Sequence, residues 1–211
     1  MEQQSVHKTY KYKLKPTPQQ ERILGRVLML CRHVYNAAIR ERREAWRSRS
    51  ISVTCYQRKA ELPGIKEAMP DYAEIHSQVL QDVVQRVDRA FTAFFRRIRE
   101  GETPGYPRFH GRDRYNSFTY PQVGEHGGAA LAGGILSLSK IGRISIRLHR
   151  PLEGTPKTVT ILREADGWYA CIACAAVPIQ LLPASGQETG IDLGIEAFAT
   201  LSNGRHIFHP G

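Results

Sequence analysis

The sequence predicts an α+β fold in which helices are inserted into an antiparallel β-sheet. The chain opens with an alternating apolar and polar run at Val6–Leu14. Two long stretches with helical spacing follow before residue 100, and short β-type runs separated by Gly and Pro fill the part after Thr103. Because one strand precedes the helices and the others follow them, the helices are predicted to interrupt the sheet.

The opening strand is predicted to have one apolar and one basic side. Tyr10, Tyr12 and Leu14 alternate with Lys11 and Lys13, and successive side chains of a strand point to opposite faces. Lys11, Lys13 and Lys15 therefore make one edge of this strand basic.

A start signal and apolar spacing predict the first long helix. The segment Thr17-Pro18-Gln19-Gln20 combines an N-cap, a proline in the first turn and a capping-box glutamine. Apolar residues then recur every three or four positions from Ile23 to Ile39, so the helix is expected to run to about Arg47.

A weaker second helix is expected over Thr54–Leu62. The pairs Pro63-Gly64 and Met69-Pro70 are typical breakers and predict that the chain leaves the helical conformation there.

The third helix is predicted over Ser77–Arg99. Its apolar stripe from Leu80 to Ile98 includes three phenylalanines, which are expected to pack in the core rather than to stack on bases. Gly101 supplies a C-terminal stop.

The part after Thr103 is predicted to be built from strands and hairpins. The Gly-rich segment Gly124–Gly134 is expected to be a flexible turn, and Asn203-Gly204 between two apolar runs predicts a hairpin. The expected strands are Ser117–Tyr120, Ile135–Leu138, Arg143–Leu148, Thr158–Arg163 and Trp168–Val177.

Cys171 and Cys174 form a C-x-x-C, a spacing found in metal and redox sites. On a strand, side chains three positions apart point to opposite faces, so this pair is predicted to be structural. Few cysteines and no signal peptide predict a reducing, cytoplasmic setting, and no apolar run reaches membrane-spanning length.

The charge distribution points to a polyanionic partner. The chain has 30 Lys and Arg against 20 Asp and Glu, a formal net charge of +10, and 20 of the cations lie in residues 1–100. Clustered cations bind nucleic acid by releasing the counterions condensed on its phosphates. The alternative is a basic surface that only keeps the protein soluble.

Three segments together resemble the TnpB (OrfB) family of transposon-associated proteins. Cys31-Arg-His-Val-Tyr-Asn resembles its R-x-V-Y-N signature, and Gly105-Tyr-Pro-Arg-Phe followed by Ser117-Phe-Thr resembles its G-x-P-R-F element. Gly190-Ile-Asp-Leu-Gly-Ile-Glu-Ala-Phe-Ala resembles its first RuvC motif.

The resemblance implies a domain organisation and an activity. It implies a wedge β-barrel domain from residues 1–15 and 103–182, an inserted helical recognition domain over 16–102, and the first strands of an RNase H-like (RuvC) domain over 187–211. The implied activity is RNA-guided cleavage of DNA with Mg²⁺. The implied partners are DNA and a guide RNA from the transposon end, in a prokaryotic cytoplasm and associated with the nucleoid.

The resemblance makes Asp192 the first RuvC carboxylate and a metal ligand. Gly190 and Gly194 would leave the flanking backbone open; the alternative is an ordinary acidic residue before a turn. Glu196 would lie about 13 Å away on an alternating strand at roughly 3.3 Å per residue, too far to share a metal pair. The family's later carboxylates and zinc element are expected to be absent, so this polypeptide is predicted not to cleave DNA and its RuvC part to be poorly packed.

The resemblance also suggests which residues bind nucleic acid. Glutamine can bond an adenine edge and hydroxyls can serve base or phosphate, while arginine pairs with phosphate. The alternative for each glutamine is a solvent-facing helix position. The candidates are Tyr56, Gln57, Ser77, Gln78, Gln81, Thr119 and Tyr120 for a DNA motif, and Lys13, Arg32, Arg40, Arg43 and Arg47 for the backbone.

Three functions remain open from the sequence. The chain is part of an RNA-guided nuclease, a non-catalytic guide-directed DNA binder or repressor, or a simple helix-turn-helix DNA-binding protein. Dependence on RNA separates the last from the first two.

Overall fold

The computed structural model describes residues 5–124, 127–179, 186 and 188–209, which form two compact units, Met1–Pro178 and Ile179–Gly211. The predicted boundary between the wedge and RuvC domains, at residues 182–187, lies outside the described residues, apart from Gly186. None of the described helices is long and apolar enough to cross a membrane.

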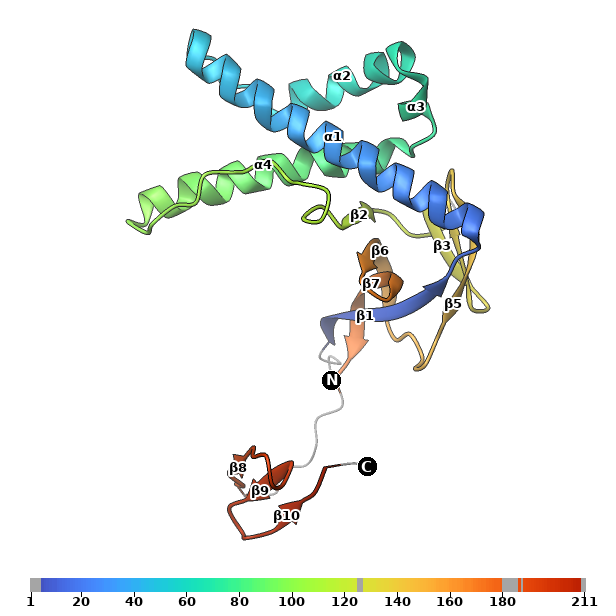
Figure 1. Cartoon of the computed structure of the whole chain (residues 1–211), viewed down its shortest axis with the longest axis vertical. Helices are drawn as coiled ribbons and strands as arrows, with labels where there is room; N and C mark the ends of the chain where they lie inside the picture. Colours follow the sequence, from blue (N-terminus) through green and yellow to red (C-terminus); the bar gives the residue numbers. More distant parts are fainter. Residues whose placement is uncertain (1–4, 125–126, 180–185, 187, 210–211) are drawn as a thin grey trace. The chain divides into compact units, whose positions relative to one another are not determined.

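The first unit contains a seven-stranded antiparallel sheet that nearly closes into a barrel (Figure 1). The spatial order is β2-β6-β7-β1-β5-β4-β3, and a bridge between Val123, which follows β2, and Ala129 of β3 links the two edges. The strands are β1 Ser5–Lys15, β2 Ser117–Tyr120, β3 Ala129–Ala132, β4 Ile135–Leu138, β5 Gly142–Arg147, β6 Thr155–Glu164 and β7 Gly167–Pro178.

Strand β1 lies inside this sheet, as its alternation predicts. It pairs with β7 over most of its length and with β5 at its end. Tyr10, Tyr12 and Leu14 are buried, while the intervening lysines are exposed. The expected turn at Gly124–Gly134 is wrong in part, because Ala129–Ala132 forms β3, whose small residues pair with β4 through tertiary packing that local propensity does not signal.

Four helices lie between β1 and β2 in the chain: α1 Pro18–Arg49, α2 Cys55–Ala68, α3 Pro70–Ala73 and α4 Ser77–Arg99. Figure 1 shows them gathered to one side of the sheet. The predicted capping box of α1 is present, with the Thr17 side chain accepting from the Gln20 backbone. Gly101 ends α4 at φ +71°, and Glu102 N–H donates to the Arg97 carbonyl in the pattern of a Schellman motif.

Two predictions about the helices are wrong. Helix α2 continues through Pro63 to Ala68 because Leu62 is buried and Ile65 packs against the core, which outweighs the lost backbone hydrogen bond. Near the end of α4, Phe95 and Ile98 are about half exposed, at 52% and 49%. The core therefore covers the apolar stripe of α4 only as far as Phe91 and, in part, Phe94.

The helices and the barrel share one apolar core. Leu24 of α1, Val83 of α4, Phe118 of β2 and Ile172 of β7 are all fully buried within it. Helix α1 packs on α4, and α4 packs on β2. The helical residues are consequently held in fixed positions relative to the barrel.

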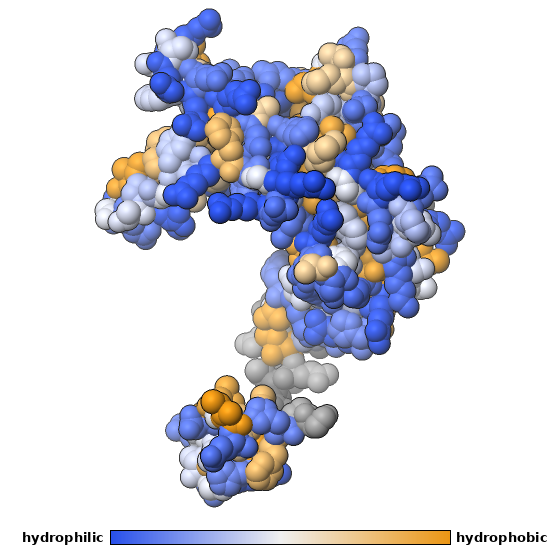
Figure 2. Space-filling view, in the orientation of Figure 1, coloured by the Kyte–Doolittle hydropathy of each residue, from blue (hydrophilic) through white to orange (hydrophobic). Residues whose placement is uncertain are grey.

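The second unit is a three-stranded sheet of order β10-β9-β8, with β8 Ile191–Asp192, β9 Ala199–Leu201 and β10 His206–Ile207. The Asn203-Gly204 hairpin is confirmed, with Gly204 at φ +82°. The unit exposes much apolar surface, including Leu193 at 70% and Ile195 at 97% (Figure 2).

Candidate nucleic-acid interface

Four arginines form a stripe along α1, hereafter the arginine face: Arg32, Arg40, Arg43 and Arg47. Intervals of eight, three and four residues at about 100° per residue place them within roughly 80° of the helix circumference. In the described chain, the ion pairs of α1 involve Arg26, Glu41 and Arg42 instead. The arginine face therefore carries charge that the described carboxylates do not neutralise.

The segment between α4 and β2 lies against this face of α1. The Arg43 guanidinium is 5.5 Å from the Tyr106 ring centroid and 5.4 Å from that of Phe109. Asn36 accepts from the His110 backbone N–H at 2.9 Å and donates to the His110 carbonyl at 3.0 Å. The first motif thus contacts His110, the residue directly after the Gly105–Phe109 motif, and Asn36 holds this segment against the helix.

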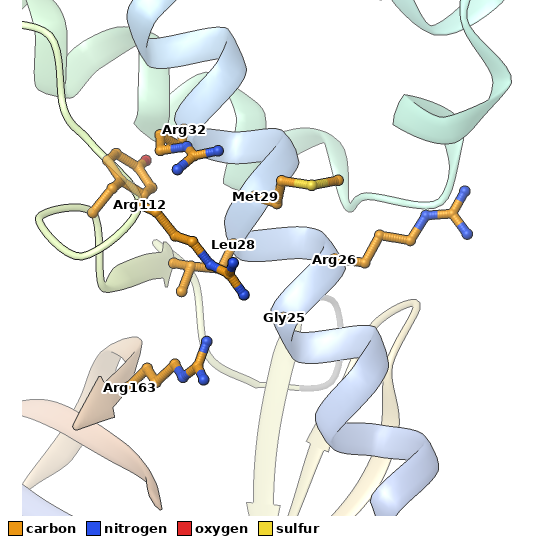
Figure 3. Close-up of a pocket in the computed structure, with 8 residues that line it drawn as sticks. Gly25, Arg26, Leu28, Met29, Arg32, Arg112 and Arg163 are labelled. Atoms are coloured by element: carbon orange, nitrogen blue, oxygen red, sulfur yellow. The ribbon is translucent and has the colours of Figure 1, made fainter. Parts of the chain in front are cut away.

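A cationic pocket adjoins the arginine face (Figure 3). It has a volume of about 460 Å³ and lies between α1, the turn at 111–114 and strand β6. Arg32 belongs to both the arginine face and the pocket. The lining residues are Gly25, Arg26, Leu28, Met29, Arg32, Arg112, Tyr115 and Arg163.

Lys13 is less available than the sequence predicts. Its Nζ is 2.9 Å from a carboxylate oxygen of Asp166, and that hydrogen bond raises the pKa of Lys13. Hydrogen bonds from Tyr169 and Lys13 lower the pKa of Asp166 to about 2. The basic edge of β1 is therefore largely paired across the sheet, and Lys11 likewise meets Glu164 at 2.6 Å.

The predicted motif-reading residues of α2 and α4 lie at or near the surface. Tyr56 is 83% exposed and Gln81 is exposed. Gln57 accepts from the Thr54 backbone in the capping box of α2, which leaves its amide group free to donate. Ser77 accepts from Lys66 at 2.9 Å, and Gln78 donates to Gln122 at 2.6 Å.

Tyr120 lies inward instead, and Thr119 on the opposite face of β2 is half-buried. Tyr120 is 1% exposed, its hydroxyl donates to the Ser139 carbonyl at 3.0 Å, and burial raises its pKa. The Thr119 hydroxyl accepts from Arg86 at 2.6 Å. The structure therefore does not support the predicted DNA contact of the Tyr120 ring, and it assigns Thr119 to the junction between α4 and the barrel.

Asp192 is exposed and pairs with Thr200 in the sheet of the second unit. Glu196 lies beyond the end of β8, so the predicted spacing along one strand does not apply to it. The described residues contain no group of three His, Cys, Asp or Glu side chains arranged to hold a metal ion. Asp192 in its described surroundings therefore does not fit the two-ion magnesium site that phosphodiester hydrolysis uses.

Cys171 and Cys174 point to opposite faces of β7, as predicted. Cys174 is buried and Cys171 is half-buried on the other side of the strand, and burial raises the pKa of both thiols. Because a metal ligand must be a thiolate, this pair is unsuited to zinc.

Sequence reasoning missed Arg86, Arg112 and Arg163. Arg86 joins α4 to β2 by donating to the Ser117 carbonyl at 2.8 Å and to Thr119. Arg112 and Arg163 line the same pocket as Arg32 because the fold brings the turn at 111–114 and strand β6 beside α1. No local pattern marks these three residues.

These features define a mixed helix-and-sheet protein whose helices present a cationic surface suited to a polyanion. A family model described as a helix-turn-helix domain (OrfB, IS605) matches residues 1–50. A putative RNA-guided DNA endonuclease of Streptomyces pristinaespiralis is 33% identical over 98% of this chain and 51% of its own length. The putative RNA-guided DNA endonuclease InsQ of Escherichia coli K12 is 28% identical over 95% of the chain and 48% of its own length. The chain is thus similar to proteins of the TnpB/OrfB family, and it spans about half the length of these relatives.

The matched helix-turn-helix segment has a different local structure here. Within residues 5–50 the chain forms β1 and then the single continuous helix α1. The capping box at Thr17 and the left-handed Ser50, at φ 54°, delimit one helix of 32 residues.

Proposed function

We propose that this chain is the nucleic-acid-binding part of a transposon-associated RNA-guided DNA endonuclease, with guide RNA and target DNA as partners. The arginine face of α1 carries this proposal. The names of the two relatives support it, since each is described as a putative RNA-guided DNA endonuclease.

The arginine face suits a sugar-phosphate backbone. Each guanidinium offers a planar set of donors that matches phosphate oxygens and remains charged at any physiological pH. The stacking of Arg43 on Tyr106 and Phe109 restricts its side chain before binding, which lowers the entropy lost on contact. The barrel and helix α4 act as the support that fixes α1.

Reading of a DNA motif is assigned to the exposed polar residues of α2 and α4. Tyr56, Gln57 and Gln81 are the leading candidates because their side chains reach solvent. Ser77 and Gln78 would have to exchange their contacts with Lys66 and Gln122 for contacts with a base.

Asp192 is proposed as one ligand of a nuclease metal site that needs further carboxylates. Because hydrolysis with two divalent ions needs several carboxylates, the 211-residue protein is predicted not to cleave DNA. Magnesium-dependent nicking that the Asp192→Ala variant abolishes would contradict it.

The test compares two triple variants that remove the same formal charge. Arg40→Gln/Arg43→Gln/Arg47→Gln removes cations without a described acidic partner, whereas Lys8→Gln/Lys11→Gln/Lys13→Gln removes cations that each pair with a carboxylate. Affinity for a labelled RNA hairpin and a DNA duplex is measured against salt concentration. Neutralising three phosphate contacts should reduce the slope of log K against log salt by about 2 to 3 in the arginine variant alone. Equal effects of the two variants would contradict a specific arginine face.

A simple DNA reader is the second candidate, favoured by the helix-turn-helix description of the matched family. Such a protein binds a defined duplex without RNA. Binding of the RNA-free protein to random duplexes, with and without RNA that copurifies from the source cells, separates the two functions.

A further inference from the structure

The cationic pocket collects three arginines from distant parts of the chain. Arg32 comes from α1, Arg112 from the turn before β2, and Arg163 from β6. Figure 3 shows Arg112 and Arg163 reaching toward the same space beside Leu28, whereas Arg26 points away. The structure therefore builds this positive site through tertiary contacts.

The charge of these three arginines is not balanced by the described carboxylates. In the described chain, the carboxylates near the pocket pair with other cations. Asp71 pairs with Arg26, and Glu164, the residue next to Arg163, pairs with Lys11. Arg163 is oriented by the Trp168 ring, whose centroid is 5.9 Å away. Like charges held together without a partner destabilise the empty fold, so an anion that fills the pocket would relieve their repulsion.

The rest of the lining is apolar or carries an unused donor. Leu28 and Met29 of α1 are the apolar side chains of the lining. Tyr115 is 6% exposed, and its buried hydroxyl has no hydrogen-bond partner among the described residues. Buried hydroxyls are normally paired, which makes this one a candidate ligand contact. The volume of about 460 Å³ lies within the range of roughly 300 to 1,000 Å³ typical of small-ligand sites.

We propose that this pocket binds one phosphate group of the bound nucleic-acid strand, with the adjoining nucleoside against Leu28 and Met29. Arg112 and Arg163 hold the phosphate, Arg32 joins the site to the arginine face, and the Tyr115 hydroxyl donates to the ligand. The inference rests on the proposed function and deepens it, because it gives the strand a fixed anchoring point beside the helix.

Continuity with the arginine face favours a strand over a free nucleotide. Arg32 lies on the same stripe of α1 as Arg43, so a backbone that follows α1 reaches the pocket without leaving the cationic surface. Free nucleotides and inorganic phosphate share the same chemistry and serve as competing ligands in the test.

The test uses Arg112→Gln/Arg163→Gln and the matched control Arg114→Gln/Lys157→Gln. The control residues come from the same turn and the same strand, are exposed, and lie outside the pocket lining. Affinity for the labelled RNA hairpin and DNA duplex should fall about tenfold or more in the pocket variant, and by about threefold at most in the control. The unliganded pocket variant should melt at or above the wild-type temperature, a result that a merely structural role of these arginines would not give.

Tyr115→Phe is the third variant. Removing a hydroxyl without a partner should leave the unliganded stability unchanged or higher, and should weaken strand binding by several-fold. Unchanged affinity would overturn its assignment as a donor.

The outcomes separate this proposal from the proposed function. Equal loss in the pocket variant and its control overturns the pocket but leaves the arginine face intact. A thermal shift with adenosine monophosphate or inorganic phosphate that the pocket variant abolishes, together with unchanged strand affinity, overturns it in favour of a free-ligand site. Failure of the wild type to bind either nucleic acid overturns the proposed function and the pocket with it.

Discussion

Replacement of Asp82 by asparagine should weaken the junction between α4 and the barrel. Asp82 is 8% exposed and accepts from Arg86 at 2.8 Å and from Arg89 at 2.7 Å. The Arg86 side chain is 22% exposed and also donates to the Ser117 carbonyl and to Thr119 on β2. Asp82 thus balances the charge of the guanidinium that connects helix and sheet.

The size of the effect follows from these contacts. Removing one partner of a buried ion pair costs about 3 to 5 kcal/mol, because the other charge stays buried. Arg86 keeps its two contacts with β2 and is about one-fifth exposed, so a cost at or just below the lower end of that range, about 2 to 3 kcal/mol, is expected. In a unit of this size the loss lowers Tm by about 5 to 10 °C.

Urea unfolding followed by far-UV circular dichroism measures this change. Arg89→Gln is the matched control, because Arg89 is 61% exposed and its pair with Asp82 should contribute about 1 kcal/mol or less. The double variant Asp82→Asn/Arg86→Gln should be more stable than the sum of the single changes predicts. An Asp82→Asn variant within about 0.5 kcal/mol of the wild type would refute the reasoning.

Three further predictions concern a turn, the partly buried imidazole of His76 and the binding of a structural metal. Gly154→Ala should destabilise the protein by about 1 to 3 kcal/mol, because Gly154 has φ +73° and a Cβ would lie 2.4 Å from the Ala175 carbonyl oxygen. The control Gly64→Ala in α2 meets open space and should leave stability unchanged or raise it. Equal urea midpoints for the two variants would contradict this. Burial lowers the pKa of His76, so the folded state disfavours its protonated form. Stability should therefore fall as the pH drops from about 6.5 through the lower folded-state pKa. His76→Asn should flatten this part of the profile of stability against pH, and an unchanged slope would count against the role of His76. Chelation by EDTA should leave Tm unchanged in wild type and in Asp192→Ala alike, and a chelator-induced drop in Tm would reveal a structural metal.

Much of the fold was predictable because its signals are local. Hydrogen bonds at helix ends involve neighbouring residues, so Thr17 and Gly101 marked the start of α1 and the end of α4 correctly. Alternation along a strand depends only on backbone geometry, which is why the opposite faces of Cys171 and Cys174 could be stated in advance. Wrong local signals arose where packing overrides propensity, as at Pro63 and in β3.

The candidate site was only partly predictable. Helical spacing alone places the four arginines of α1 on one face. Lys13 and Tyr120 differ. The partner of Lys13 is Asp166, which lies 153 residues away in the chain. Tyr120 is buried because the fold packs other strands around its ring.

By itself, the sequence determined the two long helices, most of the strands, the basic first half and the family motifs, because each of these depends on residues close together in the chain. Only the tertiary structure decided the order of the barrel strands, the contact of Asn36 with His110, the connection through Arg86 and the meeting of Arg32, Arg112 and Arg163. Pairing between distant segments is selected by the free energy of the whole packed core, which no local pattern encodes.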